Sequence, residues 1–274
     1  MSWNIATLEG AARTFRADMW DNVPEDAVSE CGIVSCRFGP IQAMLIEALP
    51  DAPGLNTVLG ASEVGTVEDD YLQEAIEWVD SFDVDYRVLI ARGRPGEGEA
   101  EAWLAANGFE QGRGLVRYVR DGSLPDLEPV AGVKVWEIGP GDADGAVETM
   151  VLSAAPAMGL PAEASTLLCD LPLQDRWRTY TAELDGDIVA YGSMLIHGRV
   201  AALGLEATDE SARRRGCNLA LLRQRLIDAS EAGCDTVFAG VPSYGDKGLA
   251  PGTRNLIRAG FVPTHHCMNW QRLR

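Results

Sequence analysis

One short stretch of the chain combines the residue types that bind a polyphosphate. Positions 213–215 are three consecutive arginines, Gly216 follows, and the apolar periodicity of a helix begins directly after it. The free N–H groups of a first helical turn and the helix dipole together attract anions. A glycine at that point lets backbone amides approach phosphate oxygens. The stretch therefore predicts a diphosphate site, although a solvated basic turn is the competing interpretation. The candidate binding residues are Thr208, Arg213, Arg214, Arg215, Gly216, Cys217 and Asn218.

Composition limits the classes of protein that could carry such a site. The 274 residues are 46% hydrophobic and 23% charged, which is typical of a globular protein. The formal net charge of −18 disfavours nucleic acid and anionic membranes as partners. The three consecutive arginines form a positively charged segment within this acidic chain. No apolar run reaches the roughly 18 residues of a membrane span, and no secretory signal is visible at the start.

Cysteine and histidine usage points to a cytoplasmic protein without a metal centre. Six cysteines are scattered with no C-x-x-C pair, and the chain has three histidines. We therefore expect reduced, mostly buried thiols and neither a zinc site nor a disulfide framework.

The site needs elements to position it, and the second half of the chain supplies them. A strand ending near Glu206–Thr208 leads into the arginine loop, and a helix marked by Leu219, Leu222, Leu226 and Ala229 follows. Gly233 is suited to end that helix. Further along, the pattern predicts a strand over 235–241, a helix over 253–259 stopped by Gly260, and a last strand through Trp270. Upstream it predicts a helix over 142–157, a hairpin over 180–196 and a strand over 199–206.

The first half shows the same plan. Leu72, Ala75, Ile76 and Val79 have the spacing of one helix face, and 86–91 is typical of a buried strand. A second helix follows and is stopped by Gly108. Since helix, strand, helix, Gly-Phe and strand occur twice, we predict tandem domains over 1–121 and 133–274, joined by a linker over 122–132. The expected fold class is mixed α/β, each domain being a mostly antiparallel sheet flanked by helices.

The second half resembles the GCN5-related N-acetyltransferases (GNAT). Members carry Gln/Arg-x-x-Gly-x-Gly/Ala at a helix start, and the match here is Arg213-x-x-Gly216-x-Asn218. The resemblance extends over about 133–274 and includes the closing Gly260-Phe261 pair and strand. The first half is similar more faintly, through 103–109. The resemblance implies that the loop holds the pyrophosphate of acetyl-CoA, the donor in amine acetylation.

Three departures from the family pattern affect this prediction. Asn218 stands where Gly or Ala is usual, so it either narrows the approach to the phosphate or donates an extra hydrogen bond. Leu256 stands where many members place a tyrosine acid. The matching stretch of the first half, 62–70, has carboxylates and no arginine, so we expect only the second half to bind a CoA-type ligand. Cys217 lies at a helix start, which lowers a thiol pKa in principle.

Glu206 is the candidate general base, because it lies at the strand end beside the motif. An exposed strand-end carboxylate without a catalytic role is the alternative. Tyr244 and Cys267 are candidates to replace the missing acid. His265 and His266 are adjacent on a predicted strand, so at most one can face a given cleft.

These observations predict an acyl-CoA-dependent N-acyltransferase of the acetyltransferase type, acting on a small amine by direct transfer in a ternary complex. Two alternatives stay open at this point. One is a GNAT-fold transferase that uses another acyl donor such as aminoacyl-tRNA. The other is a non-catalytic CoA-binding protein, which the leucine at 256 would suit.

Overall fold

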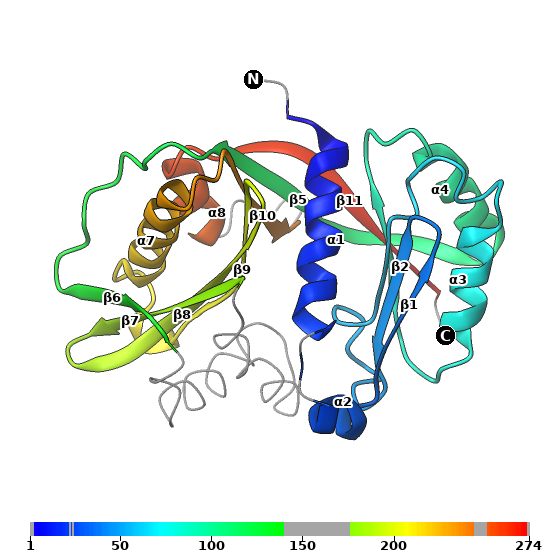
Figure 1. Ribbon diagram of the computed structural model, residues 1–274, viewed down its shortest axis with the longest axis horizontal. Coiled ribbons are helices and arrows are strands. Elements are labelled where there is room, and N and C mark those ends of the chain that lie inside the picture. The colour runs from blue at the N-terminus through cyan, green and yellow to red at the C-terminus, as the bar shows by residue number, and fades with distance from the viewer. Residues whose placement is uncertain (1–2, 22, 24, 140–175, 244–250, 273–274) are drawn as a thin grey trace. The chain divides into compact units, whose positions relative to one another are not determined.

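A computed structural model describes residues 3–21, 23, 25–139, 176–243 and 251–272 (Figure 1). The described helices are α1 (Ile5–Asp21), α2 (Glu25–Cys31), α3 (Tyr71–Asp80), α4 (Glu97–Ala106), α7 (Cys217–Glu231), α8 (Pro251–Arg258) and the 3-10 helix η3 (Glu210–Ala212). The strands are β1 (Ile33–Phe38), β2 (Ile41–Ile46), β3 (Thr57–Leu59), β4 (Arg87–Ala91), β5 (Phe109–Asp121), β6 (Val133–Glu137), β7 (Trp177–Leu184), β8 (Asp187–His197), β9 (Val200–Thr208), β10 (Thr236–Pro242) and β11 (Val262–Arg272). No helix in these ranges is long and apolar enough to cross a membrane.

Contacts divide the chain into two compact units. Unit 1 comprises residues 1–117, 241–244 and 264–274, and unit 2 comprises 118–240 and 245–263. The last strand groups with unit 1 because β11 pairs with β4 in antiparallel register. The units therefore do not follow chain order, and the domain limits 1–121, 122–132 and 133–274 stay a prediction.

Unit 1 is a mixed sheet in the order β1-β2-β3-β4-β11-β5, in which β2 pairs antiparallel with β1 and β3, β4 pairs antiparallel with β11, and β3 and β4 run parallel. Its main core joins β2, β4, α3 and α4, and residues Ile41, Ala43 and Leu45 of β2 belong to it. Strand residues alternate between faces, so Gln42, Met44 and Ile46 face the other side. They are buried there as well, and helix α1 contacts β2 (Figure 1).

Unit 2 carries the predicted site on a sheet in the order β10-β9-β8-β7-β6. Strands β9 and β10 run parallel, which a crossover helix allows, and α7 is that crossover. The other three pairs are antiparallel. Helix α7 lies along β7, β8 and β9 and buries nine of its fifteen residues (Figure 1).

Most of the predicted elements are confirmed within one or two residues. The four apolar positions predicted for the first-half helix are the buried residues of α3. The predicted hairpin is β7 and β8, whose turn at Asp185 and Gly186 has φ of 58° and 99°. Gly233 follows α7 at φ 76°, as a terminating glycine does. The helix expected over 142–157 lies outside the described residues.

Candidate active site

The loop between β9 and α7 is held in a fixed conformation by its own sequence. Asp209 accepts hydrogen bonds from the Ser211 amide (2.8 Å) and hydroxyl (2.6 Å) and thereby starts η3. Arg214 has φ 66° and Gly216 has φ 89°, both in the left-handed region. A Cβ added at Gly216 would lie 2.6 Å from Val130 Cγ1. Glycine is required at 216 both by its backbone angle and by this close contact.

The start of α7 leaves backbone donors unpaired. Gly216 provides the first carbonyl of the helix and accepts from Ala220 N–H at 2.9 Å, and none of the described side chains caps the helix. The amides of Cys217, Asn218 and Leu219 therefore have no helical acceptor. A diphosphate is the kind of anion that such a turn binds, through amides and the helix dipole.

The three arginines are exposed but differ in their partners. Arg215 Nη2 lies 2.8 Å from Asp185 Oδ2, and Arg213 Nη1 lies 3.5 Å from Glu210 Oε1. Arg214 has no ion-pair partner within the described ranges. Exposed ion pairs contribute little free energy, so an incoming phosphate can compete for Arg213 and Arg215. Arg214 is available without such competition.

Glu206 lies within β9 at a bulge. Tyr191 of β8 pairs with Ala207 and Ser193 pairs with Gly204, so Leu205 and Glu206 together oppose a single residue, Gly192. Leu205 has φ 48°, a conformation that costs a non-glycine residue about 1–2 kcal/mol. Bulges and such backbone outliers concentrate at functional sites. Thr208 is the last residue of β9 and is half-buried.

Residues 148–248 match the sequence model described as the acetyltransferase (GNAT) domain. This range contains β9, the arginine loop and α7. The chain therefore contains a GNAT acetyltransferase domain match over this range. None of the curated proteins matches the sequence.

Solved GNAT structures have the same fold over most of this chain. A GCN5-related N-acetyltransferase from Kribbella flavida is 16% identical with a TM-score of 0.59, over 91% of this chain and 92% of that one. One from Sphaerobacter thermophilus is also 16% identical with a TM-score of 0.58, over 85% and 80%. A tandem GNAT protein from the clavulanic acid biosynthesis pathway is 16% identical with a TM-score of 0.54, over 99% and 96%.

The departures from the GNAT pattern have structural counterparts. Leu256 is buried on α8, so no acid occupies that position. Asn218 Oδ1 accepts from Asn255 Nδ2 of α8 at 2.8 Å, which leaves the Asn218 amide hydrogens as its remaining donors. The prediction that the helix start lowers the pKa of the Cys217 thiol is wrong. Its side chain is buried, and this burial raises its pKa despite the helix start and the Arg215 charge.

In unit 1 the loop after β3 contains Glu63, whose carboxylate pairs with two arginines from other segments. Arg13 Nη1 of α1 lies 2.9 Å from Glu63 Oε1, and Arg94 Nη2 pairs with Glu63 Oε2. The sequence shows that 62–70 has no arginine, but it does not show that two arginines arrive from other elements. Glu63 therefore already pairs with both guanidiniums, so neither of these two cations is without an ionic partner in the described part of the chain.

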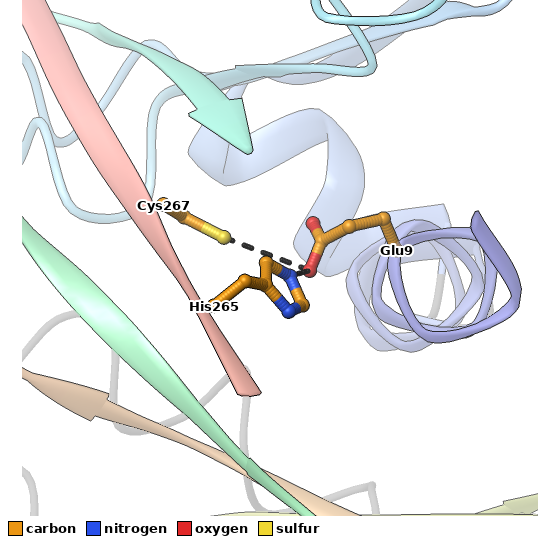
Figure 2. A group of neighbouring side chains, drawn as sticks. All are labelled: Glu9, His265 and Cys267. Atoms are coloured by element: carbon orange, nitrogen blue, oxygen red, sulfur yellow. Dashed lines mark hydrogen bonds and ion pairs between the residues drawn. The ribbon is translucent and has the colours of Figure 1, made fainter. Parts of the chain in front are cut away.

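The proposed proton donor Cys267 lies in unit 1, in a buried cluster. Figure 2 shows the Cys267 thiol and the His265 ring both pointing at one oxygen of Glu9, at 3.6 and 2.9 Å. Arg117 Nε donates to the same oxygen at 2.8 Å. Burial raises the pKa of the Cys267 thiol to about 12. A buried thiol that already donates to a carboxylate does not suit proton delivery to a leaving group. Tyr244, the other candidate, lies outside the described residues.

Glu9, His265 and Cys267 offer ligand atoms that lie within 4.8 Å of one another, a spacing that would suit a metal ion. A metal would compete with the Arg117 guanidinium for the same Glu9 oxygen. Burial raises the pKa of Glu9, but the Arg117 charge and hydrogen bonds from His265 and Arg117 outweigh it and hold that pKa well below its usual range. The Glu9 carboxylate is therefore paired with Arg117 and also contacts His265 and Cys267. These contacts join α1 to β5 and β11.

Glu9→Gln should lower the free energy of unfolding by about 3 kcal/mol at pH 7, because it removes the carboxylate that pairs with the buried Arg117 charge. The folded-state pKa of Glu9 lies below its ordinary value of 4.5. Its stabilisation is thus present above that pH and is lost as the pH falls below it. Urea unfolding of both proteins at pH 7, 5 and 3 measures this. The exposed Glu110 on β5, changed to Gln, is the control, and equal stability of both variants would contradict the cluster's role.

Proposed function

We propose that this chain is an acyl-CoA-dependent N-acyltransferase that transfers an acetyl group from acetyl-CoA to a small amine in a ternary complex. The observation that carries the proposal is the turn at 213–218 ahead of α7. Its first amides have no helical acceptor, Gly216 has φ 89°, and Arg214 has no ion-pair partner among the residues that the structure describes. The proposed ligands of the diphosphate are Thr208, Arg213, Arg214, Arg215, Gly216, Cys217 and Asn218. Cys217 contributes its amide, because its thiol is buried.

Glu206 is the proposed general base. Its side chain is 36% exposed, and Arg225 Nη2 holds its Oε2 at 2.6 Å. Oε1 has no hydrogen bond within the described chain and lies 3.8 Å from the position of a Cβ at Gly252, beside the start of α8. One oxygen is thus anchored and the other is free to accept an amine proton, directly or through water. Backbone amides near the end of β9 are the proposed donors that polarise the thioester carbonyl.

We further propose that the chain is a tandem GNAT protein in which unit 1 does not bind CoA. The repeated plan of elements supports the tandem organisation, and the clamp of Arg13 and Arg94 on Glu63 supports the division of roles. The thiols of Cys31, Cys36, Cys217, Cys234 and Cys267 are free, as in proteins of a reducing cytoplasm.

The test measures thiol release from acetyl-CoA with a panel of small amines, alongside coenzyme A binding by calorimetry. We expect release that depends on the amine and saturable binding to one site per chain. Binding without release from any amine would instead indicate a non-catalytic CoA-binding protein. Displacement of coenzyme A by tRNA would favour an aminoacyl-tRNA donor.

A further inference from the structure

The side chain of Arg225 is fully buried although it is charged. It lies on α7 in unit 2, and its side-chain exposure is 0%. A charged group removed from water costs several kcal/mol unless it is paired and hydrogen-bonded. A buried arginine therefore needs hydrogen-bond acceptors for its N–H groups, and these acceptors indicate which groups the arginine holds in place.

Each nitrogen of the guanidinium has an acceptor at the β9 bulge or on its own helix. Nη2 donates to Glu206 Oε2 at 2.6 Å, Nη1 donates to the Ser193 carbonyl at 3.2 Å, and Nε donates to the Leu221 carbonyl at 3.3 Å. Ser193 belongs to β8, directly after the residue that the bulge opposes. The guanidinium thus connects α7 to both strands that form the bulge.

The sequence also leaves room for this group. A Cβ added at Gly192 would lie 3.0 Å from Arg225 Cζ and 3.1 Å from Nη1. Gly192 does not have a positive φ, so its backbone does not require glycine, whereas a larger side chain would displace the guanidinium by a few tenths of an ångström. The absence of a side chain at Gly192, opposite the bulge, thus leaves space for the large side chain of Arg225.

Helix α7 connects the proposed diphosphate turn to Arg225. It begins at Cys217, in the proposed diphosphate turn, and Arg225 follows eight residues later. At 1.5 Å per residue the two points are about 12 Å apart along one rigid helix. The turn that receives the donor and the group that holds the carboxylate therefore keep a fixed separation.

We propose that Arg225 is a positioning residue for the acyl transfer: it fixes Glu206 through Oε2 and leaves Oε1 facing the acceptor amine. This inference rests on the proposed function of Glu206. Arg225 is buried and touches neither substrate, so it acts only through Glu206. The strained backbone at Leu205 is stabilised by the same bonds, since the guanidinium holds the side chain that follows it.

Two variants test the proposal. Arg225→Met removes the charge and the bonds, whereas Gly192→Ala keeps the arginine and displaces its guanidinium. We expect kcat/KM to fall about 10- to 100-fold in each, as for a reacting group displaced by a fraction of an ångström to one ångström. We expect the loss in Arg225→Met to fall mainly on kcat, because the arginine acts on the proposed base and not on donor binding. Coenzyme A affinity should stay within threefold of that of the wild-type protein.

The matched control is Arg223→Met. Arg223 is on the same helix but donates to the Leu127 carbonyl at 2.8 Å and makes no described contact with Glu206. We expect it to leave kcat and coenzyme A affinity within threefold of the wild-type values.

A double-mutant cycle separates this inference from the function on which it rests. If Arg225 acts through Glu206, Arg225→Met should have no further effect on kcat in a Glu206→Gln background. Full activity of Glu206→Gln alone would refute the proposed base. Additive losses would overturn the positioning role while leaving the base intact. Loss of coenzyme A binding in Gly192→Ala, which retains every charge, would show a general packing role instead and would also overturn it.

Discussion

Coenzyme A should bind about 10- to 100-fold more weakly to Arg214→Gln than to the wild-type protein. A hydrogen bond to a charged group contributes about 1.5–3 kcal/mol, and each 1.4 kcal/mol is a factor of ten in Kd. Arg214 has no partner to give up among the described residues, whereas Arg213 and Arg215 are already close to Glu210 and Asp185. We therefore expect smaller losses for the Gln variants at 213 and 215, and a loss of at least about 100-fold when all three are changed.

Calorimetry with coenzyme A measures this order directly. The control is Arg199→Gln, because Arg199 is also exposed and also pairs with a carboxylate, that of Asp235 at 2.8 Å, but lies just before the other end of β9. Exposed guanidiniums are screened by salt, so the affinity of the wild-type protein should fall with ionic strength more steeply than that of the triple variant. Unchanged affinity in the triple variant would refute the diphosphate site.

The arginine loop could be predicted from sequence because its parts are contiguous. Strand end, arginines, glycine and helix start follow one another within about a dozen residues, and local rules for glycine and for helix starts apply to each of them. The elements around it are similarly local, and the apolar spacing of α3 and α7 is strong enough to locate both helices. The last strand could be placed as an element, but the sequence does not show that it pairs with β4.

The pairings that the sequence does not reveal are between residues that are not neighbours along the chain. Glu9 and His265 are joined across 256 positions, and Glu206 and Arg225 across 19. Neither pair has a characteristic spacing, so only the fold brings them together. The single local signal was Arg225 itself, a charge among the apolar positions of α7 between Leu222 and Leu226. A charged residue on the buried face of a helix indicates a specific partner, although it does not identify that partner.

The bulge in β9 could not have been predicted from residue type. Leu205 is an apolar residue in a strand-like run, and nothing in Leu-Glu-Ala indicates a left-handed backbone. The bulge follows from tertiary context: glycine on the facing strand and a guanidinium beneath it. Strain of this kind is a feature that local propensity fails to predict, and it lies next to the carboxylate that we propose as the base.

Glu206→Gln should reduce kcat about 10²- to 10⁴-fold, the range that removing a positioned general base produces. The amide keeps an oxygen that can accept from Arg225 Nη2, so the side chain retains its place and loses only its ability to take a proton. The measurement is the initial rate of thiol release from acetyl-CoA with the best amine of the panel. Coenzyme A affinity should be unchanged, since Glu206 lies outside the 213–218 turn.

The matched control for this variant is Glu183→Gln. Glu183 is also a strand carboxylate of unit 2 with a cationic partner, Lys134 Nζ at 3.1 Å, but it lies on β7 beside the hairpin turn. Because Glu206→Gln leaves the buried Arg225 without a counter-charge, its melting temperature is measured as well, and the rates are compared well below it. A kcat within threefold of wild type at high pH and at pH 7 would show that the amine reaches the site already neutral and needs no base from this protein.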